Sequence, residues 1–189
     1  MGRREQKKIQ SRYQIMSAAM RCFGERGYSE TSIADIMTQA GMGVGTFYNY
    51  FESKEEVLVA LLERIENDLT DIAEREKHSP LSALEKLNDR TAQLLEENKF
   101  VLPLFLSASE HADRPELWRK RLRPGFKPVF EAIISHGQSL GVIRTDVSSD
   151  LITEMFHSIY HSAALSTMPI PFRTNVKLKV QLLLDGIKV

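Results

Sequence analysis

Residues 41–54, with the sequence GMGVGTFYNYFESK, have the composition of a surface that approaches an anion closely. Glycine occupies positions 41, 43 and 45. A backbone without Cβ atoms at 43 and 45 can come near a phosphate and direct its N–H groups at it. Four aromatic residues follow within five positions, and two of them carry hydroxyl groups that can reach phosphate oxygens. The stretch therefore predicts contact with a phosphate-bearing partner.

The four aromatic residues cannot all have the same role. Phe47 and Phe51 lie four positions apart and share one face of a helix, so we expect both to pack inward. Tyr48 and Tyr50 flank Asn49, and so short a helix cannot turn all of these side chains inward as well. We therefore expect the two tyrosine hydroxyls to point away from the core.

The residues before this stretch show helical periodicity. Apolar residues three and four apart predict a first helix that ends at Gly24 and Gly27. Thr31 or Ser32 supplies the N-cap hydroxyl of a second, short helix. That helix ends at Gly41, which we expect in the left-handed conformation. The apolar stripe of the first helix consists of Ile9, Tyr13, Met16, Ala19, Met20 and Phe23.

A third short helix is predicted over residues 46–50, and a long fourth helix begins after Ser53. Two helices joined by a tight glycine-containing turn form a helix-turn-helix, which places its second helix in the major groove of DNA. The charge distribution agrees with this interpretation. Residues 1–54 carry eight basic and five acidic side chains, a net charge of +3 in a chain whose total is zero. Cations concentrated at one end favour contact with phosphates.

The segment TSIADIMTQAGMGVGTFYNYFESKEEVL resembles the DNA-binding signature of the TetR (tetracycline-repressor-like) family of bacterial transcriptional regulators. The resemblance covers about residues 9–60. It implies a regulator that binds a palindromic DNA operator as a homodimer and is released by a small-molecule effector of unknown identity. The phosphate ligands that the resemblance implies are Thr31, Ser32, Tyr48, Tyr50 and Lys54. The residues that it places near base edges or adjacent phosphates are Gly43, Val44, Gly45, Thr46 and Asn49.

Two positions depart from the family pattern. Val44 stands where relatives often have a polar or basic residue, so contact with a thymine methyl group replaces a hydrogen bond there. Met37 stands where alanine is common, which predicts a slightly different packing of the two helices. The basic leader, which we define as Arg3, Arg4, Lys7, Lys8 and Arg12, is either a solvated tail or an arm that contacts the minor groove or phosphates.

The remainder of the chain is also predicted to be helical, so the fold class is all-α. Helices are expected at about 81–97, 99–111, 115–139, 148–167 and 172–187. We expect residues 1–54 to form the DNA-binding domain and residues 55–189 an effector-binding and dimerisation domain. Large side chains in the second domain either line an apolar or amphipathic pocket or simply fill the core. The candidate pocket residues are Leu62, Ile65, Leu94, Leu104, Phe105, Trp118, Phe126, Phe130, Phe156 and Tyr160.

The last two predicted helices carry the candidate dimer interface. Residues 148–167 are apolar or small on nearly all sides, and such a helix must be covered on two faces. Glu154 with two histidines on one face is an alternative metal site, but it lacks the further carboxylates that a di-iron bundle uses. Basic residues around Trp118 are either a solvated face or a counter-charge for an acidic effector. The interface residues expected are His157, His161, Ala164, Leu165, Leu178, Leu182 and Leu183.

Catalysis is not predicted. The sequence offers no nucleophile with an evident base, no glycine-rich phosphate loop between strand and helix, and no complete set of metal ligands. We expect no cofactor, no bound metal and no membrane partner. The single cysteine, Cys22, and the lack of an apolar leader favour a cytoplasmic location. The alternative is an all-α enzyme or small-molecule-binding protein with an incidental helix-turn-helix. Whether the regulator represses or activates stays open.

Overall fold

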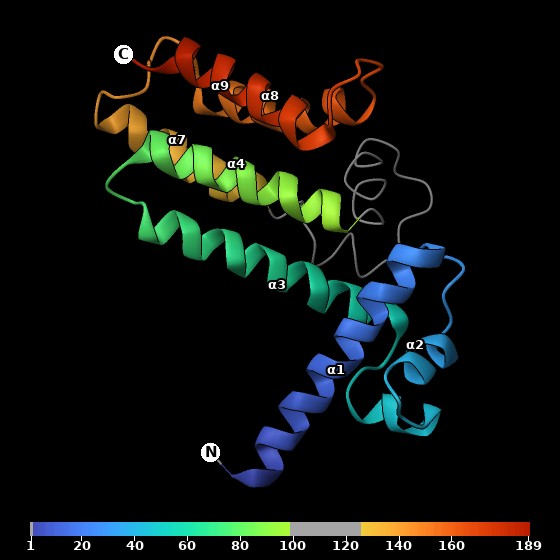
Figure 1. Cartoon of the computed structure of the whole chain (residues 1–189). Helices are drawn as coiled ribbons and strands as arrows, with labels where there is room; N and C mark the ends of the chain where they lie inside the picture. The colour runs from blue at the N-terminus through green and yellow to red at the C-terminus, as the bar shows by residue number, and fades with distance from the viewer. Residues whose placement is uncertain (1, 99–125) are drawn as a thin grey trace. The chain divides into compact units, whose positions relative to one another are not determined.

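The computed structural model describes residues 2–98 and 126–189, and the side chain of Phe126 lies outside that description. All named secondary-structure elements of the described residues are helices, which confirms the all-α class (Figure 1). Their single β-type contact is an isolated antiparallel bridge between Ile143 and Lys188. The helices are α1 (Arg3–Arg26), α2 (Ile33–Gln39), the 3-10 helix η1 (Val44–Asn49), α3 (Lys54–Arg75), α4 (Pro80–Glu97), α7 (Phe126–Ser139), α8 (Ser149–Ala164) and α9 (Phe172–Ile187).

The predicted helix at 99–111 and the candidate pocket residues Leu104, Phe105 and Trp118 lie outside the described residues. So does most of the basic cluster around Trp118. The predicted helix at 115–139 is observed from Phe126 onward. Helices α4, α8 and α9 lie close to the ranges that the sequence predicts.

The described chain separates into two compact units, which we call unit one (residues 2–64 and 98) and unit two (residues 65–97 and 126–189). The division falls inside α3, after Arg64. The predicted domain boundary after residue 54 coincides with the start of α3. This long helix therefore contributes its first half to one unit and its second half to the other.

Unit one is built on the second half of α1. The buried residues of α1 are Ile15, Met16, Ala18, Ala19, Cys22 and Phe23. The predicted stripe is confirmed at Met16, Ala19 and Phe23, and Met20 is half-buried. The stripe is wrong at its beginning, because Ile9 and Tyr13 are 40% and 50% exposed. Residues 2–10 are exposed without exception, so the first turns of α1 have no core to cover.

Helix α2 has well-defined signals at both ends. Ser32, not Thr31, is its N-cap, and Ser32 and Asp35 form a reciprocal capping box. At the other end, Met42 N–H donates to Met37 C=O and Gly41 N–H donates to Thr38 C=O, which is a Schellman arrangement. Gly41 has φ +67°, as predicted. Both ends of α2 are therefore determined by local sequence.

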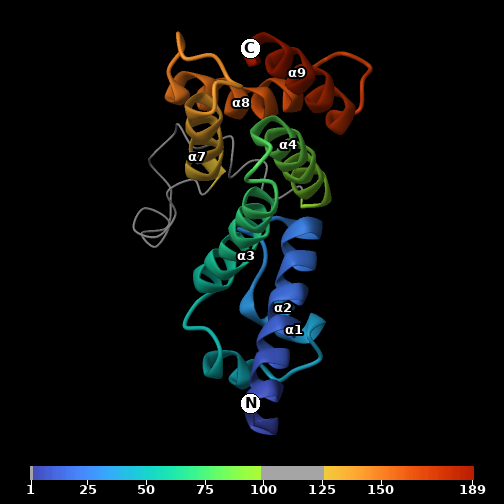
Figure 2. The same ribbon diagram turned by 90° about the vertical axis from the view of Figure 1, so that its left-hand side faces the viewer.

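Unit two contains a cycle of four packed helices. Helix α4 packs against α7 and α9, and α8 completes the cycle by packing against the same two helices (Figures 1 and 2). Its core includes a buried polar group as well as apolar side chains. Tyr160 of α8 is buried and donates a hydrogen bond of 2.5 Å to Asn88 Oδ1 of α4. Because both partners are buried, this bond specifies how α4 and α8 face each other.

Candidate DNA-binding site

Helix η1 presents the outer face that the sequence predicts. Gly43, Val44, Gly45, Tyr48 and Asn49, which we call the outer face of η1, are all exposed. Tyr48 is 63% exposed and Val44 is 46% exposed. A Cβ atom added at Gly45 would meet no heavy atom within 4 Å, so glycine is not required there by the chain itself. The space beside that backbone is open to a partner.

The inner face of η1 is anchored by two phenylalanines. Phe47 and Phe51 are 0% and 1% exposed, which confirms their predicted burial. Their ring centroids lie 5.9 Å apart. Tyr50 and Thr46 are half-buried, at the boundary between the two faces. Alternation between buried phenylalanines and exposed neighbours fixes which side of η1 faces outward.

Two side chains of α1 bind the carbonyl ends of the helix-turn-helix. Arg12 Nη1 donates to Tyr50 C=O at 2.8 Å, and the guanidinium carbon lies 4.2 Å from the centroid of the Phe51 ring. Gln14 Nε2 donates to Ala40 C=O at 2.9 Å. Carbonyl groups at the C-terminal end of a helix have no hydrogen-bond donor within that helix. Side chains of α1 provide the donors here. Neither contact is visible in the sequence pattern, because both join residues that are far apart in the chain.

Lys54 makes an internal contact of the same kind. Its ammonium group donates to Tyr28 C=O and Thr31 C=O, both at 2.7 Å, and lies 4.4 Å from the centroid of the Tyr28 ring. These contacts join the start of α3 to the loop before α2. Burial and the nearby Glu55 raise the pKa of Tyr28 to about 12, so this phenol stays neutral. The phosphate contact expected of Lys54 stays a prediction and must compete with these carbonyls.

Thr31 is wrong as a phosphate ligand. Its side chain is 1% exposed, and its hydroxyl donates to Gly27 C=O at 2.8 Å, with Cys22 C=O at 3.2 Å as a second acceptor for the same proton. The hydroxyl therefore completes the end of α1 and does not face outward. The sequence could not separate Thr31 from its neighbour Ser32, since both are hydroxyl residues at the same helix start.

Ser32 is exposed and remains available to a partner. Its hydroxyl donates to Asp35 Oδ2, and Arg26 Nη1 donates to Asp35 Oδ1 at 2.8 Å. Hydrogen bonds from Ser32, followed by the Arg26 charge, lower the pKa of Asp35 below its usual range. The Asp35 carboxylate repels a phosphate and already accepts from both the hydroxyl and the backbone N–H of Ser32, so the phosphate contact expected of Ser32 stays a prediction and must compete with Asp35.

Residues 15–61 match the family model of the bacterial regulatory proteins of the tetR family. This part of the chain therefore carries the DNA-binding segment typical of the TetR family. The HTH-type transcriptional repressor DhaR of Mycobacterium sp. (strain GP1) is 29% identical over 161 residues, which are 82% of this chain and 80% of that protein.

Solved structures of transcriptional regulators share the fold. FadR of Bacillus subtilis in complex with stearoyl-CoA has a TM-score of 0.73 at 20% identity, over 93% of this chain and 98% of that chain. SmeT, the repressor of the Stenotrophomonas maltophilia multidrug efflux pump SmeDEF, has a TM-score of 0.73 at 22% identity, over 94% and 90% of the two chains. A further SmeT structure contains triclosan.

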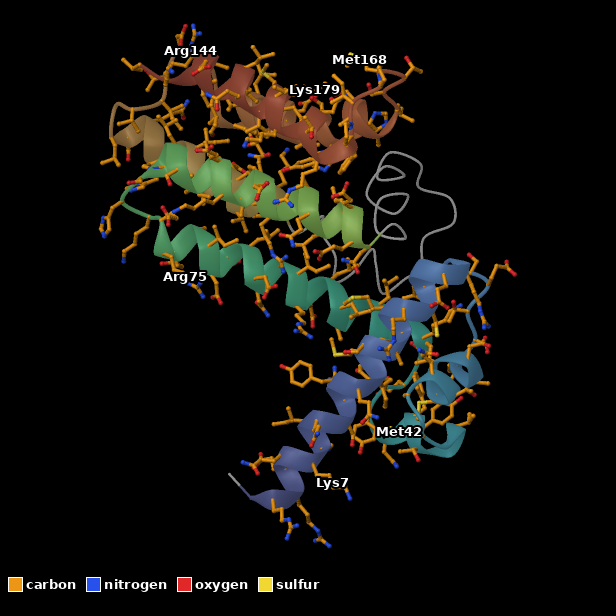
Figure 3. All side chains as sticks on the ribbon, viewed as in Figure 1. Lys7, Met42, Arg75, Arg144, Met168 and Lys179 are labelled. Atoms are coloured by element: carbon orange, nitrogen blue, oxygen red, sulfur yellow. The ribbon has the colours of Figure 1, made fainter. Side chains whose placement is uncertain are left out.

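The basic leader divides into two parts. Arg3, Arg4, Lys7 and Lys8 are exposed, and Figure 3 shows the Lys7 side chain on the first part of α1. Arg12 is half-buried and bound to Tyr50 and Phe51, so it is not part of a solvated tail. Because four cations remain on exposed turns of a helix, they stay available to phosphates.

Most candidate pocket residues within the described chain are core residues. Ile65, Leu94, Phe130, Phe156 and Tyr160 are buried, and Leu62 is half-buried. The rings of Phe130 and Phe156 have centroids 5.7 Å apart. Unit two also contains a charged cavity of about 710 Å³ between α3, α4 and α9, and an apolar cavity of about 360 Å³ between α3, α4 and α7. Neither is lined by Phe130, Phe156 or Tyr160, so the pocket that these residues were expected to line stays a prediction.

The candidate dimer residues lie on α8, α9 and the turn after α8. Leu165, Leu178 and Leu182 are exposed, and Leu182 is 74% exposed. Ala164, Leu183 and His157 are half-buried, whereas His161 is exposed. Met155 of α8 is 45% exposed as well. Helices α8 and α9 therefore present an apolar surface that is not covered within the described residues.

The histidines on α8 differ in environment. Burial, followed by the positive charges of Lys127 and His161, lowers the pKa of His157, and Glu154 opposes this shift. Within the described ranges, no group of three His, Cys, Asp or Glu side chains is arranged to hold a metal ion. In the same ranges, no helix combines the length and apolar character needed to cross a membrane.

Proposed function

We propose that this protein is a ligand-responsive transcriptional regulator that binds a palindromic DNA operator as a homodimer and acts as a repressor. The observation that carries the proposal is the outer face of η1, whose exposed residues alternate with the buried anchors Phe47 and Phe51. A short helix held in this way inside a helix-turn-helix suits the major groove. Repression is inferred from relatives whose names identify them as repressors.

The DNA contacts proposed come from the outer face of η1 together with Ser32, Thr46 and Tyr50. Tyr48 and Tyr50 contact phosphates, while Thr46 and Asn49 lie nearer the bases. The exposed cations of the basic leader add phosphate contacts from α1. Within this assignment, residues 1–54 are the DNA-binding domain and residues 55–189 the effector and dimerisation domain. A regulator of chromosomal DNA acts in the cytoplasm of a bacterium.

The effector proposed is a small, largely apolar or amphipathic molecule. Two neighbours in fold hold ligands of this kind, stearoyl-CoA in FadR and triclosan in SmeT. For such a ligand, unit two offers the apolar cavity of about 360 Å³ between α3, α4 and α7. The effector can release the protein from DNA only if it binds more tightly to the conformation that has low affinity for DNA. An effector with equal affinity for both conformations would not change their populations.

Selection from a random DNA library with the full-length protein tests the proposed function. We expect an enriched palindrome whose half-sites lie about 34–36 Å apart, or a multiple of that distance. Tyr48→Phe should weaken binding to all sequences alike, because it removes a phosphate contact. Asn49→Ala should cost about 1–3 kcal/mol and relax the preference at one base pair. Enrichment of no sequence, or wild-type affinity in the Tyr48→Phe, Asn49→Ala double variant, would contradict the proposal.

A further inference from the structure

Helix η1 depends on the rest of unit one for its position. It is a 3-10 helix of six residues without a side-chain hydrogen bond at its N-cap. Hydrogen bonds in 3-10 geometry are weaker than those of an α-helix, and one or two turns do not persist by themselves. The outer face is exposed, so only the inner face and the two ends can hold η1 in place.

Phe47 and Phe51 hold the inner face of η1, but apolar burial is not directional. It leaves η1 free to slide or rotate by small amounts on the surface below. A directional contact is needed at an end of the helix to remove that freedom. The structure supplies one such contact at the C-terminal end, on two adjacent residues.

Arg12 makes both parts of this contact. One N–H of its guanidinium donates to Tyr50 C=O at 2.8 Å, and the guanidinium carbon lies over the Phe51 ring, 4.2 Å from its centroid. A charge-assisted hydrogen bond fixes distance and direction, and the cation–π contact fixes the ring beside it. Arg12 belongs to α1. Gln14, two positions further along the same helix, donates a hydrogen bond to Ala40 C=O at the end of α2. Helix α1 thus holds the carbonyl ends of both helices of the helix-turn-helix.

We propose that Arg12 is a positioning residue for DNA recognition, which sets the orientation of η1 by binding Tyr50 C=O and Phe51. The proposal rests on the proposed function only for its effect on DNA. A lysine at position 12 would keep the charge but lose the planar group that both contacts use. A direct phosphate contact by Arg12 is the competing explanation, because four of its five N–H donors are not used by Tyr50.

Hydrogen exchange in the absence of DNA gives the first test, with the full-length variants Arg12→Met and Arg12→Lys. Arg21→Met is the matched control, because Arg21 is an exposed arginine of the same helix. The relevant amides are those of Tyr50 and Phe51, which donate to Phe47 C=O. We expect exchange at both to be at least about tenfold faster in Arg12→Met, the effect of one lost charge-assisted hydrogen bond. Arg12→Lys should be intermediate, and Arg21→Met should match the wild type.

Binding to DNA gives the second test, with the sequence selected by the wild type and a scrambled duplex of equal length. We expect Arg12→Met to reduce the ratio of the two affinities by about tenfold or more, while the salt dependence of scrambled binding stays that of Arg21→Met. Unchanged exchange at residues 50 and 51, or equal loss of affinity for both duplexes, overturns the proposal. If the wild type selects no sequence, the proposed function fails, and the exchange rates still decide the role of Arg12. If Arg12→Met does not fold, Arg12→Lys carries both measurements.

Discussion

At the scale of single residues, the bond between Tyr160 and Asn88 predicts a measurable loss of stability in Tyr160→Phe. Both residues are 1% exposed, so the variant leaves Asn88 Oδ1 buried without this donor. We expect the free energy of unfolding to fall by about 1–3 kcal/mol in urea denaturation. Burial raises the pKa of Tyr160 strongly, so the phenol remains a donor across the accessible pH range.

Two controls make the Tyr160 prediction specific. Tyr48→Phe removes a phenol hydroxyl from a residue that is 63% exposed, and it should change stability by less than about 0.5 kcal/mol. The double variant Tyr160→Phe, Asn88→Leu removes both partners and should lose less than the sum of the single variants. Additive losses would show that the two side chains do not stabilise each other.

At the scale of elements, Gly41, which follows α2, and Gly45, which lies inside η1, have different physical roles. Gly41 has φ +67°, so Gly41→Ala places a Cβ atom in the left-handed region and should cost about 1–2 kcal/mol of stability. Gly45 has open space around it and no positive φ. Gly45→Ala should keep or slightly raise the stability, yet weaken DNA binding, because the new methyl group occupies space open to the partner.

Urea denaturation and DNA binding of the two alanine variants, measured side by side, separate these roles. Gly41→Ala is predicted to affect DNA binding only in proportion to its loss of folded protein. Wild-type DNA affinity in Gly45→Ala would mean that the backbone at residue 45 does not approach DNA closely. A stable Gly41→Ala would mean that the Schellman ending of α2 tolerates a side chain.

At the scale of the whole molecule, dimerisation through α8 and α9 predicts that Leu182→Arg is monomeric. Leu182 is 74% exposed in the single chain, and covering it with a second copy would bury an unpaired guanidinium in the variant. We expect the dissociation constant of the dimer to rise by about a hundredfold or more in analytical ultracentrifugation. Leu140→Arg is the matched control, because Leu140 is 52% exposed after α7 and outside this surface. A Leu182→Arg dimer of wild-type affinity would exclude this part of α9 from the interface.

The same assembly should respond to pH through His157. The pKa of this histidine is lowered by burial, Lys127 and His161, so the folded chain binds fewer protons than the unfolded chain. Stability is therefore complete above the ordinary histidine pKa of about 6.5 and is lost as pH falls from there toward the lowered value. Burial of His157 in a dimer would strengthen the effect.

Sedimentation and urea denaturation between pH 7.5 and 5.5 test the role of His157. His157→Gln should remove most of the pH dependence, whereas the exposed His136 serves as the control in His136→Gln. A wild-type dimer that is indifferent to pH in this range would place His157 outside the interface.

The amino-acid sequence by itself determined the all-α class, the helix-turn-helix and the two faces of η1. These features depend on interactions between near neighbours in the chain: apolar spacing, the Ser32–Asp35 capping box and the left-handed Gly41. The burial of Phe47 and Phe51 could be predicted for the same reason, since four-residue spacing on a helix is a local property.

Only the tertiary structure decided what the long polar side chains of unit one do. Arg12 and Lys54 are cations of the kind that bind phosphate, but each donates hydrogen bonds to backbone carbonyls more than twenty positions away in the chain. Thr31 and Ser32 are chemically alike, yet one hydroxyl is buried and the other exposed. A flexible cation or a hydroxyl binds whichever acceptor packing brings within reach, and helix ends leave such acceptors unpaired. Those distances arise when α1, α2 and η1 assemble, so no local pattern in the sequence contains them.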